Sequence, residues 1–427
     1  MAEKKKGARK KTQRKQREIK KTKKLLRILY PKKVLDIEKE LESVEVDPAG
    51  VRRMRDKGLS AFFKITFVRN PAANIIKQAM LSLGGDAAIS YKALVQPGRR
   101  TDVVLIGSLA QIKKLPGKLK SQQFGLAEIA EELEGKLAGI NYNIREFVCA
   151  AGKISFKKGP AIMGIINVTP DSFFDGGKYF NGDAAVEHAL KLVKDGANII
   201  DVGGESSRPG SNRISEKEEV KRVIPVIKKI KARTKVFISV DTGRASVARK
   251  ALSAGASIIN DISGMTFDPK MPGLAVRSGA GCIIMHMKGR PGTMQKRPQY
   301  NDLMGEISGF LEERARILVK AGVNKKSISI DPGIGFGKTV RQNYVILNRL
   351  EEFIALGYPV TVGVSRKSFI GQVTGAEPEE RLPGTIAAEA ISVFLGAHII
   401  RAHDVKEAAQ AVKVSWALRN CDGVKKV

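Results

Sequence analysis

Residues 161–177 read Ala-Ile-Met-Gly-Ile-Ile-Asn-Val-Thr-Pro-Asp-Ser-Phe-Phe-Asp-Gly-Gly. An uninterrupted apolar run, Ala161–Ile166, is followed at Asn167 by an amide, hydroxyls, carboxylates and paired glycines. This pattern is typical of a buried strand that leads into a polar loop carrying chemistry. The same change from apolar to polar recurs seven more times before the chain ends, and this repetition decides the fold.

The repeated pattern predicts a (β/α)₈ barrel. Eight strand–helix units over about 260 residues match the size of that fold, and runs rich in Val and Ile without alternation suit strands buried on both faces. An open doubly wound sheet is the rival fold, but it would use fewer strands and usually a glycine-rich turn after the first. After 161–166, the expected strands are 198–202, 236–240, 257–259, 281–285, 327–330, 359–364 and 398–400. Helical periodicity is clearest at 184–194, 216–232, 246–254 and 307–321.

The chain before the barrel has two parts of different composition. Residues 1–33 hold 16 Lys and Arg against Glu3 and Glu18, so we expect a basic, disordered tail. Residues 34–150 mix strand-like and helix-like segments, which predicts a small α/β domain of unknown role, and we assign 155–427 to the catalytic barrel. Within the small domain we expect strands at 59–68 and 102–106 and helices at 72–83, 110–119 and 126–137.

Composition and charge limit the classes of function. The formal net charge of +32 attracts anionic ligands and, less selectively, nucleic acid. The tail lacks aromatic residues interleaved for base stacking, so we expect nucleic-acid contact at most as a secondary property. No apolar run reaches the roughly 20 residues of a membrane span, and the start lacks the apolar core of a secretory signal. Three widely separated cysteines suggest neither a disulfide framework nor a zinc site, so a cytoplasmic location is the default.

Polar side chains follow every expected strand of the barrel. In a parallel barrel these strand ends meet on one rim, where active sites lie. Singly, each residue has a simpler explanation: Asp241 and Asp331 could be helix N-caps, and His286 could be a core histidine. Jointly, amides, carboxylates and cations on one rim favour a binding site. Its candidate residues are Asn167, Arg208, Asp241, Asn260, Asp331, Lys367, Arg401 and His403.

The candidates form three sets with different chemistry: carboxylates with an amide, the N-terminus of a helix, and a cationic patch. Carboxylates and an amide at Asp241, Asn260 and Asp331 could bind the edge of a flat heterocycle that presents an amino group and a ring N–H. A helix beginning near Lys367 and Ser368 would favour an anion such as a carboxylate. The remaining group forms a cationic patch suited to phosphates and consists of Asn167, Arg208, Arg401 and His403.

These strand ends resemble the dihydropteroate synthase family. The resemblance covers about residues 160–415 and all eight strand ends in order. It implies a barrel enzyme that joins 7,8-dihydropterin-6-ylmethyl diphosphate to p-aminobenzoate, releasing diphosphate and forming dihydropteroate for folate synthesis. Members are commonly homodimers. The motifs that carry it are Asn167–Gly177, Asp201–Gly210, Ile238–Thr242, Ile258–Gly264, Met285–Gln295, Ile330–Thr339, Val364–Gly371 and Arg401–Val405.

The resemblance also implies roles for individual residues. Asn167 resembles the residue linked to Mg²⁺ and the diphosphate, and Ser207 stands where threonine is usual in the family. The implied catalytic set is Asn167, Arg208, Asp241, Lys367, Arg401 and His403. The implied pterin site is Asp241, Asn260, Met285, Asp331, Phe336 and Lys367, and the implied diphosphate site is Asn167, Arg208, Arg401 and His403. The implied p-aminobenzoate site is Phe174, Ser207, Pro209 and Ser368.

Three other functions remain open at this stage. A pterin-dependent methyltransferase of related barrel design would share the carboxylate and amide pocket, but it has no leaving diphosphate and no need for the cationic set. A homologue coupling a modified arylamine, as in methanopterin synthesis, is not excluded. A non-catalytic RNA-binding or scaffold protein would depend on the basic tail and on residues 34–150.

Overall fold

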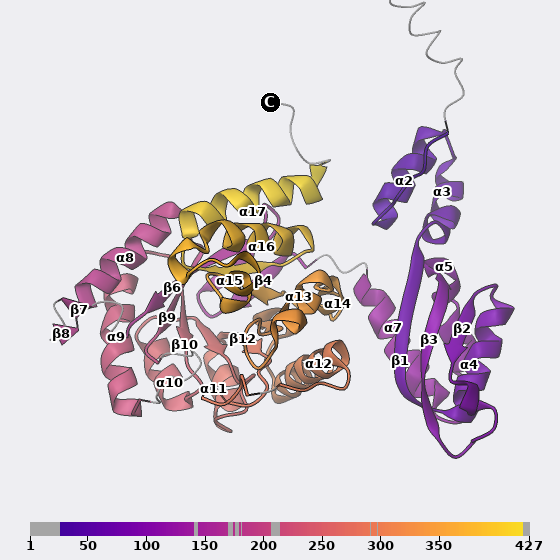
Figure 1. Ribbon diagram of the computed structural model, residues 1–427, viewed down its shortest axis with the longest axis horizontal. Helices are drawn as coiled ribbons and strands as arrows, with labels where there is room; N and C mark the ends of the chain where they lie inside the picture. Colours follow the sequence, from indigo (N-terminus) through magenta and orange to yellow (C-terminus); the bar gives the residue numbers. More distant parts are fainter. Residues whose placement is uncertain are drawn as a thin grey trace, which may run out of the picture. The chain divides into compact units, whose positions relative to one another are not determined.

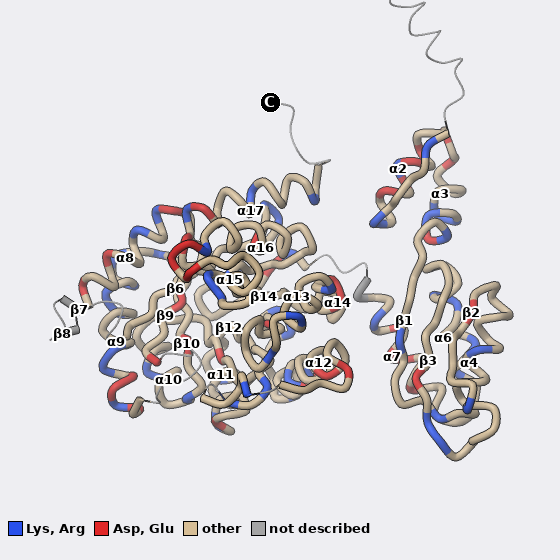
Figure 2. The backbone as a smooth tube through the Cα atoms, in the orientation of Figure 1, with Lys and Arg blue, Asp and Glu red and all other residues tan. Residues whose placement is uncertain are grey.

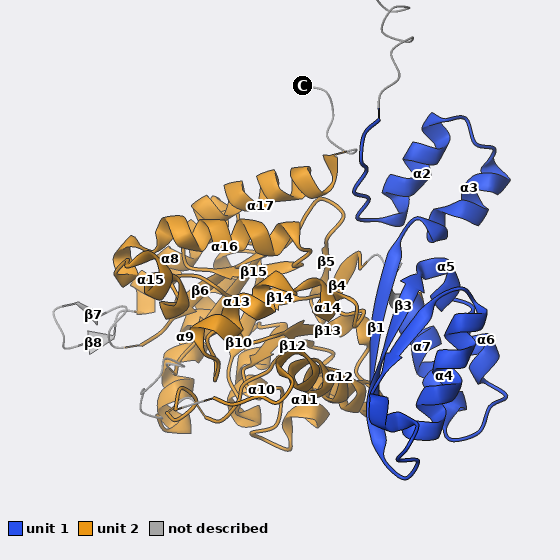
Figure 3. Ribbon diagram, turned by 45° about the vertical axis from the view of Figure 1, so that its right-hand side comes forward, with its two compact units in different colours: residues 1–137 blue, residues 138–427 orange. Residues whose placement is uncertain are grey.

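The computed structural model describes residues 26–140, 144–169, 174–175, 179–180, 182–205, 214–290, 292–296 and 298–421. The chain divides into two compact units, residues 1–137 and 138–427 (Figure 1, Figure 3). Figure 2 shows basic and acidic residues on elements of both units. Within the described ranges, no helix is long and apolar enough to cross a membrane.

The first unit contains a three-stranded antiparallel sheet in the order β1-β3-β2. Helix α4 begins at Asn70 with Pro71 in its first turn, and its buried face includes Ile76 and Met80. The expected helix at 110–119 is in fact two short helices, since Pro116 has no N–H to donate to a preceding turn. The elements are α2 (Val34–Ser43), α3 (Pro48–Met54), β1 (Ser60–Arg69), α4 (Asn70–Ser82), β2 (Asp86–Ile89), β3 (Arg100–Ser108), α5 (Leu109–Ile112), α6 (Leu115–Leu119) and α7 (Leu126–Ile140).

The second unit is built on eight parallel strands, and the barrel prediction is confirmed. The strands follow one another in chain order, and β15 pairs with β6. A parallel bridge between Ile330 and Val360 joins β13 to β14 and closes the ring. The strands are β6 (Ala161–Asn167), β9 (Ile199–Gly203), β10 (Phe237–Asp241), β11 (Ile258–Asp261), β12 (Gly281–Met285), β13 (Ile328–Asp331), β14 (Thr361–Val362) and β15 (Ile399–Ala402).

Helices surround the barrel strands (Figure 1). Their apolar faces and the outward side chains of the strands form one continuous core, in which Val226, Ile307 and Leu318 are fully buried. The principal helices are α8 (Gly182–Asp195), α9 (Glu216–Arg233), α10 (Ala245–Ser253), α11 (Met271–Ser278), α12 (Leu303–Ala321), α13 (Val340–Asn348), α15 (Ser368–Thr374), α16 (Leu382–Phe394) and α17 (Val405–Arg419).

A hairpin fills the amino-terminal end of the barrel. Strands β4 (Glu146–Cys149) and β5 (Gly152–Ser155) are antiparallel, and Phe147 is buried among the first residues of the barrel strands. Gly281 makes room for it, because a Cβ there would lie 2.7 Å from Phe147 Cζ. The hairpin therefore belongs to the second unit, and the domain boundary expected at 150–155 lies earlier, after Leu137. With this end filled, the opposite rim carries the polar strand ends.

Candidate functional site

Side chains from four barrel strands meet in one hydrogen-bonded network. Asp201 on β9 is fully buried, and its Oδ2 accepts from Arg401 Nε at 2.7 Å and from Asn260 Nδ2 at 3.0 Å. Arg401 Nη2 donates to Asp241 Oδ2 at 2.9 Å. Strands β9, β10, β11 and β15 thus contribute two carboxylates, an amide and a guanidinium to one place. Three of these residues were predicted as site residues, and the structure brings them together.

Asp201 was not among the predicted site residues, although its motif was recognised. It lies inside the apolar run Ile199–Gly203, where a charge is costly unless it is paired. A carboxylate in the middle of a strand buried on both faces was therefore the signal that could have identified it.

The ends of β13 and β14 form the other half of the site. Asp331 is buried, and its Oδ1 accepts from Gly333 N at 2.7 Å. Lys367 Nζ hydrogen-bonds to the carbonyl of Ile334 and lies 4.6 Å from the centre of the Phe336 ring. Met285, at the end of β12, is paired in register with Asp331. Three predicted pterin-site residues, Asp331, Phe336 and Lys367, therefore lie around one turn after β13, with Met285 beside it.

Burial dominates the electrostatics of this rim. Burial raises the pKa of Asp331, and Lys367 opposes that shift. Burial likewise raises the pKa of Asp241, and the Arg401 cation opposes it. The pKa of Lys367 is lowered to about 8 by burial, against the attraction of Asp331. Such desolvated and oppositely charged groups are typical of sites that bind polar ligands.

The predicted phosphate group is only partly described. Asn167 ends β6, is half-buried and pairs in register with Gly203. His403 directly follows β15, and its backbone N and Nδ1 lie 3.2 and 3.0 Å from Ser365 Oγ after β14. Ser368 is exposed as the first residue of α15. The structure does not describe Ser207, Arg208, Pro209 or the side chain of Phe174.

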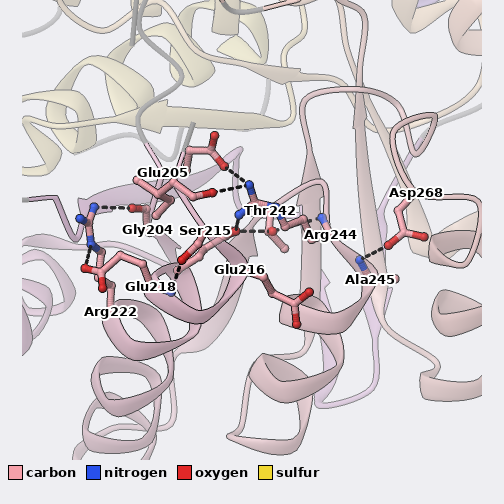
Figure 4. Close-up of polar contacts among 12 residues, drawn as sticks. Gly204, Glu205, Ser215, Glu216, Glu218, Arg222, Thr242, Arg244, Ala245 and Asp268 are labelled. Carbon is pink, nitrogen blue, oxygen red and sulfur yellow. Dashed lines mark hydrogen bonds and ion pairs between the residues drawn. The ribbon is translucent and has the colours of Figure 1, made fainter. Parts of the chain in front are cut away.

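A second polar network lies beside the rim and was not predicted (Figure 4). Glu219 on α9 is buried, accepts from Thr242 Oγ1 at 2.6 Å and forms an ion pair with Arg244. Arg244 also pairs with Glu205 at 3.3 Å and donates to the carbonyl of Ile214 at 2.7 Å. Glu205 and Ile214 flank residues 206–213, so one guanidinium holds both ends of that segment.

The metal expectation can be tested against the donor groups. Among the residues that the structure describes, no group of three or more His, Cys, Asp or Glu side chains could hold a metal. Mg²⁺ is commonly bound through one or two protein oxygens together with substrate phosphates and water. Asn167 offers one amide oxygen at the rim, which fits an ion that is held mainly by a phosphate ligand.

Comparisons with known proteins agree with this geometry. The family model described as pterin binding enzyme matches residues 163–403. Dihydropteroate synthase of Bacillus subtilis is 49% identical over 273 residues, which cover 64% of this chain and 93% of that protein. A solved structure of dihydropteroate synthase from Xanthomonas albilineans in complex with 7,8-dihydropteroate superposes with a TM-score of 0.58 at 37% identity, covering 66% of this chain and all of that one.

One further relative includes the first unit. A probable bifunctional folylpolyglutamate synthase/dihydropteroate synthase of Haloferax volcanii is 39% identical over 397 residues, or 90% of this chain and 46% of that protein. Because residues 138–427 alone are too few for this match, it extends well into residues 1–137.

Proposed function

Because this chain belongs to the dihydropteroate synthase family of pterin-binding enzymes, we propose that its barrel condenses (7,8-dihydropterin-6-yl)methyl diphosphate with p-aminobenzoate. The products are 7,8-dihydropteroate and diphosphate. The observation on which this function depends is that Asp241, Asn260 and Arg401 meet in one network. Beside this network lies the turn after β13, which begins at Asp331 and is contacted by Lys367.

The buried carboxylates and the amide bind the pterin ring. Asp241 and Asp331 accept from the amino group and ring N–H groups of the heterocycle, and Asn260 can both accept and donate. Charge-assisted hydrogen bonds in a desolvated pocket are stronger and more directional than neutral ones in water. Met285 and Phe336 supply apolar surface beside the ring.

The cations serve the leaving group. The C–O bond to the diphosphate breaks largely before the amine attacks, so negative charge develops on the departing oxygen. Arg401, His403 and Arg208 stabilise that charge, which is commonly the largest contribution to catalysis of this kind. The carboxylates stabilise the electron-poor methylene through the ring. The neutral arylamine is itself the nucleophile, and no activated protein nucleophile is needed.

Mg²⁺ is proposed as the cofactor, with Asn167 as its protein ligand. When bound with the diphosphate, the ion neutralises charge on the phosphate oxygens. The p-aminobenzoate carboxylate is assigned to the start of α15 at Ser368, with Ser207, Pro209 and Phe174 bordering the ring.

We infer a reducing, cytoplasmic location. The thiols of Cys149 and Cys282 are buried and free, and Cys421 is exposed and free. Free thiols are typical of proteins from reducing compartments.

The decisive experiment is a two-substrate assay of the whole chain. Incubation with the dihydropterin diphosphate, p-aminobenzoate and Mg²⁺ should give dihydropteroate and diphosphate in equal amounts. A methyltransferase would release no diphosphate, and a methanopterin-type homologue would prefer a modified arylamine over p-aminobenzoate.

Two variants test the assigned site in the same assay. Asp331→Ala and Arg401→Ala should each lower kcat/KM at least about a hundredfold, since each removes a charged partner from a desolvated site. Near wild-type values in both variants would refute the site, even if the wild-type chain were active.

A further inference from the structure

Lys338 is a buried cation that the proposed mechanism does not use. It follows the turn after β13, and only 2% of its surface is exposed. Its Nζ lies 3.1 Å from His286 Nδ1, 3.3 Å from the carbonyl of His286 and 3.0 Å from the carbonyl of Phe336. The ammonium therefore has three acceptors, which belong to two different strand ends.

These acceptors join the end of β12 to the turn after β13. The two backbones are in close contact, because a Cβ at Gly333 would collide with the carbonyl of His286 and one at Gly337 with that of Lys288. Both glycines have positive φ, of 69° and 64°, which other residues adopt only with strain. Lys338 thus bridges a junction where the backbones themselves leave no room for side chains.

The turn held in this way carries the proposed pterin contacts. Its first part is fixed by Gly333 N, which donates to Asp331 Oδ1 at 2.7 Å. At its centre, the carbonyl of Ile334 accepts a hydrogen bond from Lys367, and the ring of Phe336 lies against the ammonium of Lys367. A shift of this turn would move a carboxylate, an aromatic ring and a lysine together.

Burying an ammonium here has a cost that an apolar side chain would not have. Burial lowers the pKa of Lys338 to about 7, and the nearby Asp331 carboxylate opposes the shift. Lys367 also faces it and lowers its pKa further. His286 is kept neutral, since burial lowers its pKa to about 3, so its Nδ1 can accept from Lys338. A methionine would fill similar space without this cost, so the contribution of Lys338 must come from its hydrogen bonds and charge.

We propose that Lys338 is a positioning residue for the pterin substrate, fixing the turn after β13 against the end of β12 so that Asp331 and Lys367 are held for binding. The inference rests on the pterin site of the proposed function. It assigns Lys338 no contact with either substrate.

The test compares Lys338→Met and Lys338→Gln with a matched control, Lys288→Met. Lys288 lies near the same junction, but its Nζ bonds to Glu306 and to the carbonyl of Gln299 and lies over the Tyr300 ring, and its side chain is 42% exposed. The affinity for the dihydropterin diphosphate is measured by pterin fluorescence, and the KM for p-aminobenzoate at saturating pterin diphosphate. Circular dichroism establishes the folded fraction of each variant.

Lys338→Met should weaken pterin diphosphate binding roughly tenfold to a hundredfold, the loss expected for hydrogen bonds from a charged donor. The KM for p-aminobenzoate should change much less. Lys338→Gln keeps a donor and should lose less affinity than Lys338→Met, whereas Lys288→Met should bind as the wild type does. If Lys338→Met does not fold, Lys338→Gln against Lys288→Met carries the comparison.

Folded Lys338 variants with wild-type pterin affinity would overturn the inference, as would equal losses for both substrates. Asp331→Ala shows whether the role of Lys338 alone is wrong or the proposed pterin site as well. If Asp331→Ala loses pterin binding while the Lys338 variants keep it, only the role of Lys338 is wrong. If Asp331→Ala also binds normally, the pterin site itself is wrong.

Discussion

Lys367 combines a hydrogen bond to a backbone carbonyl with a position over an aromatic ring, at the edge of a pocket rich in carboxylates. Burial lowers its pKa to about 8, while Asp331 raises it and Arg401 lowers it. The residue is therefore a cation below pH 8 and increasingly neutral above it. Its charge is available at neutral pH but is lost in a range where exposed lysines are still protonated.

Activity should consequently fall as the pH rises through about 8. We expect kcat/KM for the pterin diphosphate to lose its Lys367-dependent part above that pH, because the neutral amine no longer offsets the charge of Asp331 and the substrate. Lys367→Arg keeps the cation at high pH and should move the basic limb upward, although with lower activity overall. A pH–rate profile of both proteins checks this. An unchanged basic limb in Lys367→Arg would assign the limb to another group.

Glu389 on α16 is a buried carboxyl group to which, unlike Lys367, the proposed function gives no role. It is fully buried, and neither carboxyl oxygen has a hydrogen-bond partner among the described residues. Burial, together with Asp404, raises its pKa to about 8. In the unfolded chain the group ionises near pH 4.5, so between these values the folded state holds a proton that the unfolded state has released. The contribution of Glu389 to the stability of the wild type should therefore decline from pH 4.5 to 8.

Glu389→Gln should remove this decline. The variant should resemble the wild type near pH 4.5 and become more stable than it by a few kcal/mol at pH 8, at roughly 1.4 kcal/mol per unit of pKa difference. Urea unfolding across this range measures the difference, with the exposed Glu313→Gln as the control. Parallel stability curves for Glu389→Gln and the wild type would show that Glu389 ionises normally in the folded chain.

At the residue scale, the residues that could be predicted were those at the ends of the barrel strands. Asp241, Asn260, Asp331 and Arg401 stand directly at strand ends, where the change from apolar to polar sequence is visible. Asp201 and Lys338 were missed, because one lies within an apolar strand and the other after a glycine-rich turn. Their roles depend on partners far away in sequence, which composition and spacing do not reveal.

At the scale of elements, the barrel strands agree with the sequence to within a few residues. Most are short runs rich in Val and Ile, with a polar residue at their end or soon after it, and burial on both faces enforces the apolar pattern. The β4–β5 hairpin was missed because its strands are four residues each, and only three of those residues, Phe147, Cys149 and Ile154, are buried. Strand β2 was missed for a similar reason, since Asp86–Ile89 contains two alanines and a single β-branched residue.

Helix α9 and the segment after β10 together hold the ends of residues 206–213 through Arg244. Among the described residues, Arg244→Met leaves the buried Glu219 with Thr242 as its one side-chain partner, so stability should fall by about 1 to 3 kcal/mol. Residues 206–213 include Ser207 and Pro209, which are assigned to p-aminobenzoate, whereas Arg208 alone of this segment is assigned to the diphosphate. The KM for p-aminobenzoate should therefore rise more than that for the pterin diphosphate. Urea unfolding and two-substrate kinetics measure both effects.

Arg222→Met is the matched control for Arg244. Arg222 donates to the carbonyl of Gly204 at 3.1 Å and pairs with Glu218, so it contacts one end of the segment only. Its loss should affect the KM for p-aminobenzoate less than the loss of Arg244. Equal effects in the two variants would contradict a role for Arg244 in joining both ends.

At the scale of the whole molecule, the first unit accompanies the barrel in the Haloferax volcanii relative as well. Its sheet and helices have a separate core, in which Ile76, Met80 and Leu105 are fully buried. The residues named in the proposed chemistry all belong to the second unit.

Helices α16 and α17 carry large apolar side chains that are exposed. These helices pack on each other, yet Ile391, Val414 and Leu418 are 55%, 61% and 65% exposed. Large apolar side chains gathered on neighbouring helices mark interaction surfaces more often than isolated ones do. We therefore propose that a second copy of the chain covers this face, in keeping with the homodimer expected from the family resemblance.

Replacing Val414 and Leu418 with glutamate should convert the dimer to a monomer. In a two-fold symmetric interface, the two glutamates of one copy would be buried near the same two glutamates of the other copy. Burying these like charges together has a much higher free-energy cost than leaving them exposed in a monomer. Sedimentation of the double variant measures the change. Val319→Glu, at a position 41% exposed on α12, is the control and should leave the mass unchanged. If the wild type were a dimer and the double variant kept its mass, another face would join the copies. If the wild type were already monomeric, the proposed dimer would be wrong.

Because every described residue of the proposed site comes from one barrel, the monomeric variant should still bind the pterin diphosphate.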